Sequence, residues 1–423
     1  MLRSSPHSTV QSTKQWMALR DLNRLGVDVT PSGWVLSTIG SACDIRNELR
    51  LPLSVEDRSN MSGTYPYYGP TGILDYINEY RTEGEFALIG EDGDHFLDPE
   101  NKAQTIRVNG KFNVNNHAHL VAGTDRCDID WFTYFYSHRD IFHSLTRQGA
   151  NRFKLTKFAL KKLPILLPPL PEQRRIAAIL RTWDEAIEKL YVLRITAIKR
   201  RSWTRSNLLT GDVRLGNFAQ PWETVAFGEV VTEHGQNSVP GDEVFSVSVH
   251  KGLVNQIEHL GRSFSAANTD HYNRVLPGDI VYTKSPTGDF PLGIIKQSYT
   301  EAPVIVSPLY GVFTPETEAL GFILDSLFES PVTVQNYLHP LVQKGAKNTI
   351  AITNKRFLEG KLKLPRDPVE QEAIAQYILN DRAYVEGIDK EISALKRQKR
   401  GLMQKLLTGE WRLSASSQSE DSA

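Results

Sequence analysis

Three groups of residues in the sequence could do chemistry. His117 and His119 alternate along one expected strand and could both face a metal ion, but no cysteine or third ligand lies close to them in the sequence. The acidic run 91–94 (Glu-Asp-Gly-Asp) could bind a cation, although such a run is also typical of a solvated turn. Glu100 and Lys102 form a Glu-x-Lys pair without the Pro-Asp dipeptide that would complete a nuclease site. None of the three groups is complete on its own.

Several widespread catalytic signatures are missing. The chain contains no Gly-x-Gly, which removes the dinucleotide-binding fingerprint. The Gly-Lys pairs at 110–111 and 360–361 lack the Ser or Thr of a P-loop, and there is no Asn/Asp-Pro-Pro-aromatic motif of an amino-methyltransferase. No nucleophile with an adjacent base can be identified. We therefore expect a chain without catalysis of its own, with no catalytic, cofactor-binding or metal-binding residue.

Positive charge is concentrated in two stretches. Residues 189–205 contain six basic side chains and residues 396–405 contain five, and neither stretch has an acidic one. Cations near the carboxyl end of a helix can be an ordinary solvated face favoured by the helix dipole. They can also contact phosphates or dock an acidic partner. The candidates for these roles are Arg194, Lys199, Arg200, Arg201, Arg205, Lys396, Arg397, Lys399 and Arg400.

Polar side chains in glycine-flanked loops are candidate DNA contacts. Asn and Lys can address base edges, and Lys, Ser and Thr can address phosphates. Each of these residues taken singly could equally be plain surface. The candidates are Asn113, Asn115, Asn116, Arg147, Lys284, Ser285, Thr287, Lys344, Lys347 and Asn348.

One segment that occurs twice must position these residues. Its first copy runs from Glu172 to Gly211 and its second from Glu370 to Gly409, with a constant offset of 198 and no gap. Each copy starts with Glu-Gln after a proline-rich run and ends with Leu-Leu-Thr-Gly, two residues and Arg-Leu. A repeat at a fixed period indicates duplicated architecture, and this period is long enough for a domain plus a long helix.

Each copy has the pattern of a long coiled-coil helix. The first is expected at 172–209, with Pro171 just before it and Gly211 just after it. Apolar residues alternate spacings of four and three at Ile176, Leu180, Trp183, Ile187 and Leu190; the seam weakens at Arg194 and Arg201 before Leu208 restores it. The second seam comprises Ile374, Ile378, Val385, Ile388, Ile392, Leu395, Leu402 and Leu406, interrupted at Asp381 and Lys399.

The repeats divide the chain into modules. We expect an α+β fold with two mixed, mainly β modules separated by two helices that pair as an antiparallel coiled coil with pseudo-two-fold symmetry. Both modules begin with a Trp followed six residues later by a Gly, at Trp34 and Trp222. The expected division is 1–30 (a segment with a short helix at about 13–25), 31–165 (module), 166–215 (helix), 216–365 (module), 366–413 (helix) and 414–423 (acidic, Ser-rich disordered tail).

Composition restricts the class of protein further. Forty-nine Lys and Arg balance 49 Asp and Glu, so affinity for nucleic acid must come from local patches. The two cysteines, Cys43 and Cys127, are expected to be free thiols in a reducing cytoplasm. No signal peptide and no run of 18 apolar residues is present, so no membrane partner is expected.

The repeated segment resembles the specificity subunits of type I restriction-modification enzymes. The run Leu-Pro-Pro-Leu-Pro-Glu-Gln-Arg-Arg-Ile-Ala at 167–177, closing on Leu-Leu-Thr-Gly, is similar to their central conserved region, and the second copy to their distal one. The motifs at 67–73 with 87–93, and at 272–282 with 307–313, are similar to two classes of target recognition domain. The resemblance covers about residues 31–413 and is strongest in the paired segments.

That resemblance implies a defence protein that reads double-stranded DNA. Each recognition domain would bind one half of a bipartite, asymmetric site, and the helices would set the distance between the halves. Methylation subunits with S-adenosylmethionine would dock on the frame, and restriction subunits with ATP and Mg would join through them, so this chain needs no cofactor. Two alternatives remain: a scaffold of two protein-binding modules on a coiled-coil spacer, and a nuclease that uses Glu100 and Lys102.

Overall fold

The structure is a computed structural model, and it describes residues 19–147, 153–260, 269–344 and 350–413. The chain forms two compact units, one made of residues 1–189 with 392–423 and the other of residues 190–391. Two long helices, α6 (Leu170–Leu208) and α11 (Pro368–Leu407), each contribute residues to both units. None of the helices in the described ranges has the length and apolar character needed to cross a membrane.

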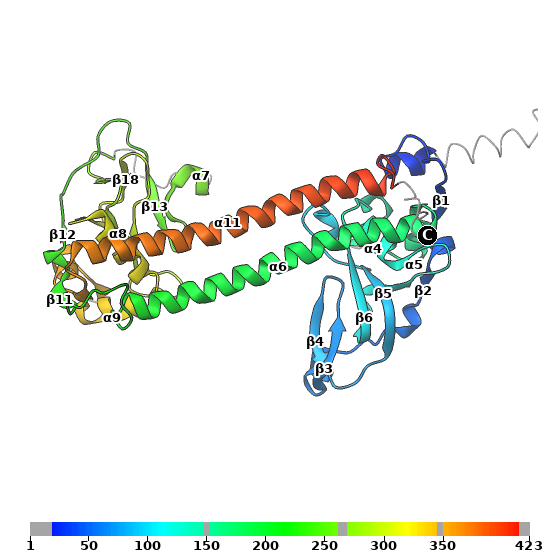
Figure 1. The fold of residues 1–423 in the computed structure, drawn as a ribbon, viewed down its shortest axis with the longest axis horizontal. Coiled ribbons are helices and arrows are strands. Elements are labelled where there is room, and N and C mark those ends of the chain that lie inside the picture. Colours follow the sequence, from blue (N-terminus) through cyan, green and yellow to red (C-terminus); the bar gives the residue numbers. More distant parts are fainter. Residues whose placement is uncertain (1–18, 148–152, 261–268, 345–349, 414–423) are drawn as a thin grey trace, which may run out of the picture. The chain divides into compact units, whose positions relative to one another are not determined.

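Unit 1 is built around a six-stranded sheet in the order β2-β7-β5-β6-β3-β4 (Figure 1). Strand β5 is central and pairs antiparallel with both β6 and β7, and β3 runs parallel to β6. The elements are β1 (Val35–Thr38), α2 (Ile39–Ala42), β2 (Asp44–Ile45), α3 (Val55–Ser59), β3 (Ser62–Tyr68), β4 (Ile73–Ile77), β5 (Thr82–Gly90), β6 (Thr105–Val114), β7 (Ala118–Ala122), α4 (Ile129–Ser137), β8 (Thr146–Arg147), β9 (Phe153–Lys154), α5 (Lys157–Lys162) and β10 (Pro164–Leu167).

Helix α4 fills the core of unit 1. Its aromatic residues Trp131, Phe132, Phe135 and Tyr136 are at most 1% exposed, and Asp128 caps its first turn by accepting from the backbone N–H groups of the two residues that follow Ile129. The aromatic run 131–136 lies within this helix. Burying four aromatic rings against the sheet is the main apolar contribution of this helix.

Unit 2 has a smaller, four-stranded sheet in the order β12-β19-β16-β17. Phe227 lies at the centre of an aromatic cluster with Phe313, Phe328, Tyr337 and Phe357. The elements are β11 (Glu223–Ala226), β12 (Val231–Thr232), β13 (Phe245–Ser248), β14 (Gly252–Asn255), α7 (Gln256–Leu260), β15 (Asn273–Val275), β16 (Ile280–Thr283), β17 (Ile294–Gln297), β18 (Val304–Val306), β19 (Gly311–Pro315), α8 (Glu318–Phe328), α9 (Pro331–Leu338), β20 (Gln343–Lys344), β21 (Ile350–Ala351), α10 (Asn354–Leu358) and β22 (Lys361–Leu364).

In both units, the first strand of the module pairs with its last strand. The strand after the module's first Trp pairs antiparallel with the strand before the long helix, as β1 with β10 in unit 1 and β11 with β22 in unit 2. The start and the end of each module are therefore tied together where the helix begins. The predicted α+β class with two modules and two long helices is confirmed, with sheets of different size and strand order in the two modules.

The long helices begin slightly earlier than the sequence suggests. Helix α6 starts at Leu170, so Pro171 lies inside the first turn instead of before it, and α11 starts at Pro368 itself. Proline is tolerated there because the first N–H groups of a helix have no intrahelical acceptor. The short helix expected at 13–25 is seen at 19–24; Trp16 lies outside the described residues.

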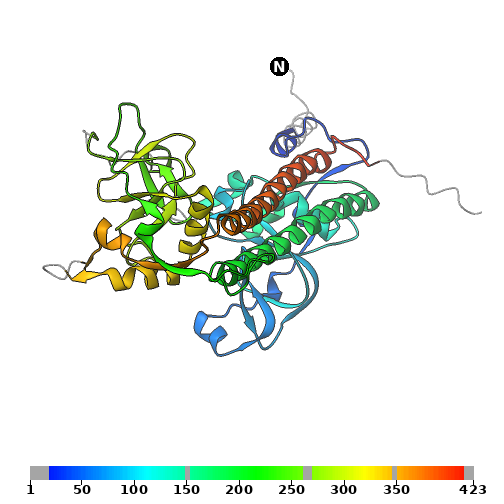
Figure 2. The same ribbon diagram turned by 60° about the vertical axis from the view of Figure 1, so that its left-hand side comes forward.

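The predicted seams form the buried faces of both helices. In unit 1, Ile176, Leu180 and Leu406 are at most 2% exposed, and α6 and α11 lie side by side in both views (Figure 2). In unit 2, Ala197, Thr204 and Ile374 are at most 7% exposed, so the seam continues past the basic positions with smaller side chains. The two helices run antiparallel within each unit, as the ion pairs described below show. The first part of α6 contacts the last part of α11 in unit 1, and the last part of α6 contacts the first part of α11 in unit 2.

Candidate nucleic-acid interface and its frame

A buried glutamate anchors the module to the helix in unit 1. Glu172, at the start of α6, accepts a hydrogen bond from Nε1 of Trp34 (3.2 Å) and two from Arg412, Nε (2.9 Å) and Nη2 (3.0 Å). The Glu172 side chain is 6% exposed, so the fork of the guanidinium neutralises a carboxylate that has lost most of its water. The arginine also lies over the Trp34 ring, 5.4 Å from its centroid.

Unit 2 repeats this anchor: Glu370 lies 198 positions after Glu172, Arg214 lies 198 positions before Arg412, and Trp222 opens the second module as Trp34 opens the first. Glu370 accepts from Nε1 of Trp222 (3.1 Å) and from Arg214 through Nε (2.5 Å) and Nη2 (2.6 Å). Its side chain is 2% exposed. The sequence contained the signals, namely the Trp that opens each module, the Glu-Gln pair and the Arg-Leu that follows Leu-Leu-Thr-Gly. Nothing in those signals indicated that the three would meet.

The glutamine next to each anchor connects the frame to the main helix of the module. Gln173 donates to the carbonyl of Pro168 (2.7 Å) and accepts from the backbone of Asp128 (2.8 Å), which is the N-cap of α4. Gln371 donates to the carbonyl of Pro365 (2.8 Å) and accepts from the hydroxyl of Thr317 (2.8 Å), the N-cap of α8. The repeated Glu-Gln pair therefore orients each module on its helix.

Most of the basic candidates on the helices have partners within their own unit. Arg194 binds Asp389 (2.5 Å) and Arg200 binds Asp381 (2.7 Å) across the helix pair, while Arg400 donates to the carbonyl of Glu100. Lys199, Lys396 and Arg397 have exposed side chains. The remaining three, Arg201, Arg205 and Lys399, take part in the unequal contacts described next.

Equivalent positions of the two helices carry different charges. In unit 1, Lys399 Nζ contacts Asp184 Oδ1 at 2.5 Å and so joins the helices directly. The counterpart of Asp184 is Arg382 and that of Lys399 is Arg201, so in unit 2 both positions are cationic. Glu329, just after α8, binds Arg201 (2.7 Å), Arg205 (3.1 Å) and Arg382 (3.0 Å). The second module thus supplies the anion that α11 lacks at position 382. The helix pair in unit 1 and the helix pair in unit 2 are therefore not interchangeable.

The candidate DNA contacts of the first module divide into buried and exposed side chains. Asn113 is fully buried; it donates to the carbonyl of Glu79 (2.8 Å) and accepts from the backbone of Arg81 (2.9 Å). Asn115 is 7% exposed and accepts from the backbone of His117 (2.9 Å). These two asparagines hold the end of β6, so we leave them out of the DNA contacts that we propose. Asn116 and Arg147 are exposed.

In the second module, Lys284, Ser285 and Thr287 form one exposed loop after β16. Partial burial lowers the pKa of Lys284, with Glu233 acting in the opposite direction. Lys344 belongs to β20, while Lys347 and Asn348 lie outside the described residues.

An exposed aromatic surface on unit 1 was missed from the sequence. Tyr76 is 49% exposed and Tyr80 39%, and Lys111 Nζ lies 4.6 Å from the centroid of the Tyr80 ring. Flat rings beside a cation suit contacts with bases and phosphates. The alternating pattern of β3 and β4 could have indicated it, because Leu74 and Tyr76 lie on the face opposite the buried Ile77.

The acidic and histidine candidates serve the structure of unit 1. Nε2 of His119 donates to the carbonyl of Leu155 (2.6 Å), and Nδ1 accepts from Asn47 (2.8 Å), so no lone pair remains for a metal. Burial lowers the pKa of His119, which favours this neutral form. Glu91 binds Arg50 (2.6 Å) and Lys154 (2.9 Å). Across the described ranges, no group of three or more His, Cys, Asp or Glu could hold a metal ion.

The frame and the modules together define the class: two unlike modules attached by the same Trp-Glu-Arg anchor to two paired helices. Residues 31–196 match the model of the type I restriction modification DNA specificity domain. This match agrees with the resemblance found in the sequence.

Three curated specificity subunits are similar to the chain. A putative type I restriction enzyme specificity subunit of Haemophilus influenzae is 38% identical over 142 residues, which cover 34% of this chain and 35% of the relative. The EcoprrI subunit of Escherichia coli is 29% identical over 31% of each chain. The putative MjaX subunit of Methanocaldococcus jannaschii is 24% identical over 66% of each. The chain spans about a third of the length of the first two relatives.

A solved structure extends the similarity of fold to nearly the whole chain. The S subunit of a type I restriction-modification system from M. genitalium superposes with a TM-score of 0.56 and 16% identity over 90% of this chain and 99% of that one. This similarity concerns the fold, including its two long helices.

Proposed function

We propose that the chain is the DNA-reading specificity subunit of a type I restriction-modification complex. It reads a bipartite, asymmetric site in double-stranded DNA and directs methylation and cleavage by partner subunits. The observation that carries the proposal is the pair of unlike modules on one duplicated frame. The family match covers only the first of these modules and part of α6, so the role of the second rests on the repeated anchor.

The difference between the modules has a direct consequence for the DNA site. The anchors at Glu172 and Glu370 are alike, but the sheets that they carry have six and four strands in unrelated orders. Side chains that read base edges would therefore differ between the two halves. Two unlike readers on one frame require two unlike half-sites.

Mapping of DNA methylation tests the proposal. In a host that expresses this chain with its methylation subunits, we expect modified bases in two short, different sequences separated by unspecified bases. The same host without this chain is the control and should lack those modifications. A palindromic site, or one continuous modified site, would contradict the proposal. Duplex binding by the complex also distinguishes it from a protein-binding scaffold.

The partners follow from the same proposal. Methylation subunits that bind S-adenosylmethionine dock on the helices, and ATP- and Mg-dependent restriction subunits join through them. Helix α6 offers a surface for this docking in unit 2. Val192 is 60% exposed, Ile195 53% and Trp203 59%, and with Lys199 between them they follow helical spacing along one face. Exposed apolar side chains in such a row are typical of a protein interface.

Replacement of Ile195 by Asp is expected to break the complex with the methylation subunits. A charge in the centre of an apolar interface would have to be desolvated without a partner, and we expect at least a tenfold loss of affinity. Co-elution of the two proteins in size-exclusion chromatography measures the effect. Leu309→Asp is the matched control, because Leu309 is 71% exposed elsewhere on unit 2. Equal co-elution of Ile195→Asp and the parent would remove α6 from the docking surface.

Lys284 is proposed to contact a phosphate. Its replacement by Ala should weaken binding to all duplexes alike and reduce the slope of log K against log salt by about one unit, since one counterion fewer is released. Titrations of the complex at several salt concentrations measure the slope. Lys363→Ala, on the exposed side of β22, should leave the slope unchanged. A sequence-dependent loss instead of a uniform one would assign Lys284 to base recognition.

A further inference from the structure

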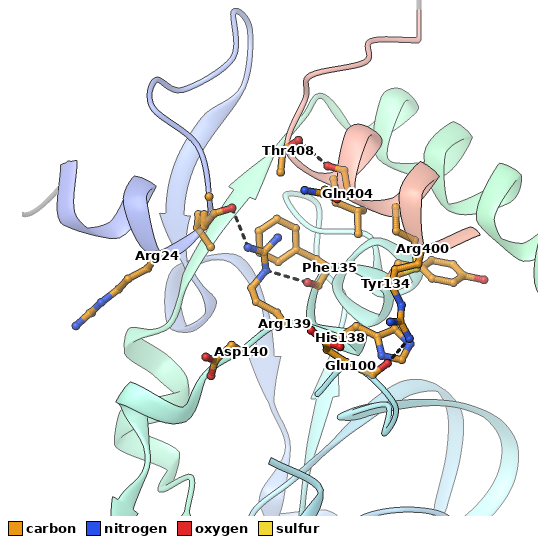
Figure 3. A pocket seen from close by; sticks show the side chains of 14 residues that line it. Arg24, Glu100, Tyr134, Phe135, His138, Arg139, Asp140, Arg400, Gln404 and Thr408 are labelled. Atoms are coloured by element: carbon orange, nitrogen blue, oxygen red, sulfur yellow. Dashed lines mark hydrogen bonds between the residues drawn. The ribbon is translucent and has the colours of Figure 1, made fainter. Parts of the chain in front are cut away.

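A pocket in unit 1 lies apart from the modules' exposed faces. It has a volume of about 410 Å³ and is lined by Glu100 and by three segments: the turn at Leu25 and Gly26, the carboxyl end of α4 with the residues after it, and the last turns of α11 (Figure 3). A volume of this size falls in the range of small-molecule sites, about 300 to 1,000 Å³. No part of the recognition frame described above uses this pocket.

Arg139 is a cation without a counter-ion in the wall of this pocket. Its Nε donates to the carbonyl of Phe135 (3.1 Å) and its Nη1 to the carbonyl of Leu25 (3.1 Å). The guanidinium lies 4.1 Å from the centroid of the Phe135 ring. No carboxylate is bound to it in the described ranges. Burial lowers the pKa of Arg139 to about 10, as expected for a cation that lacks an anion.

The acidic residues of the lining do not neutralise this charge. Asp140 is exposed and accepts from the backbone of Phe142 (2.8 Å). Glu100 is also exposed, and its backbone carbonyl accepts from Arg400. The close-up shows the Arg139 side chain between Phe135 and the turn at residue 25, with Asp140 directed elsewhere (Figure 3). The charge of Arg139 therefore remains available inside the pocket.

A second cation strengthens the positive potential. Arg400 projects from α11 into the same lining. His138 donates from Nδ1 to the carbonyl of Pro99 (2.9 Å), and its Nε2 has no hydrogen-bond partner among the described residues. Burial lowers the pKa of His138, and the charges of Lys399 and Arg400 lower it further. An anion would therefore meet a favourable field at this end of the pocket.

Several other lining residues of the pocket are apolar. Phe135, Met403 and Leu407 contribute a ring, a thioether and an aliphatic chain, and Tyr134 adds a second ring. Its hydroxyl is already bound to Asp184 (2.8 Å). Aromatic and thioether surfaces of this kind pack against flat, apolar groups.

We propose that this pocket binds a small organic anion, with its carboxylate or phosphate on Arg139 and Arg400 and its flat body against Phe135 and Met403. The ligand would contact α4 of the first module and the last turns of α11 at once. It would therefore stabilise the attachment of the module to that helix. This site is independent of the DNA-reading role.

Calorimetric titration of the full-length chain tests the site. AMP and 2-naphthoate serve as anionic probes, adenosine and 2-naphthamide as their uncharged counterparts, and inorganic phosphate as the charge alone. We expect at least one of the two organic anions to bind at least tenfold more tightly than its uncharged counterpart and than phosphate. AMP binding more tightly than 2-naphthoate would identify a phosphate ligand, and the reverse a carboxylate ligand.

Variants locate the binding. Arg139→Gln should lower the affinity for the anionic probe at least tenfold, because it removes the charge and the paired N–H donors of the guanidinium. Gln404→Trp, at the exposed rim, should block the pocket without changing Arg139, which covers the case in which Arg139→Gln is unstable. Arg46→Gln, an exposed arginine paired with Glu48, is the control and should bind normally. The proposal is overturned if neither organic anion binds, or if the Gln404→Trp variant binds the probe as the parent does.

Discussion

A chain with one heptad inserted into α6 after Lys189 and one into α11 after Glu391 is expected to direct methylation to a site whose spacer is longer by about three base pairs. Both helices pass from unit 1 to unit 2 at these positions. One heptad adds about 10 Å at 1.5 Å per residue, and duplex DNA rises about 3.4 Å per base pair. A whole heptad also returns the apolar seam to the same face. The bases of the two half-sites should not change.

Selection from DNA libraries with spacers of random length measures this effect. Three added base pairs also rotate one half-site by roughly 100° about the DNA axis, so we expect weaker binding to the new optimum than the parent shows to its own. Replacing one heptad without lengthening the helices is the control and should keep the parental spacer. Altered bases within either half-site, or an unchanged spacer, would show that the helices do not set the distance.

The helices were predictable because their pattern repeats. The fixed offset, the flanking prolines and the alternation of three and four residues are local signals, and the structure contains both long helices; α6, expected at 172–209, runs from Leu170 to Leu208. The seam positions Ile176, Leu180 and Ile388 are buried as expected. The interruption at Arg194 did not end the pairing, because Ala197 and Thr204 still fill the seam while Arg194 reaches Asp389. A pattern based on large apolar residues does not detect seam positions that are filled by small side chains.

The anchors and the DNA candidates were harder to predict. Trp34, Glu172 and Arg412 are far apart in the sequence, so only folding brings them together. Asn113 has the residue type of a base reader, but its amide completes the hydrogen bonds of a loop next to β6. Composition and loop position do not distinguish these two uses. Local polarity identifies loops, and burial decides which of their side chains are free.

The unequal ends of the frame explain why the modules should not be exchanged freely. Asp184 pairs with Lys399 within the helix pair of unit 1, whereas Arg201 and Arg382 pair with Glu329 from the second module, and Arg382 also pairs with Asp325 of that module. A first module placed on the second position would leave two arginines without that carboxylate. Buried cations without a partner destabilise a fold. The duplication therefore became specialised at the junction of helix and module.

Removal of the Arg214 side chain is expected to destabilise unit 2 strongly. The Glu370 side chain is 2% exposed, and in the Arg214→Ala variant it would lose its counter-ion and keep one hydrogen bond, from Trp222. Leaving a buried charge uncompensated costs about 3 to 5 kcal/mol. For a unit of this size, that corresponds to a melting temperature lower by roughly 10 °C. Differential scanning calorimetry of the full chain measures the loss.

Two further variants separate the buried charge from the loss of a side chain. Arg366→Ala breaks an exposed pair with Glu316 (3.6 Å, with side chains 41% and 47% exposed) and should cost less than about 1 kcal/mol. Arg214→Met combined with Glu370→Leu removes both charges and should be more stable than Arg214→Ala alone, because no ion is left buried. A double variant less stable than Arg214→Ala would contradict this expectation. It would show that the attraction between Arg214 and Glu370 stabilises unit 2 by more than the desolvation of Glu370 costs.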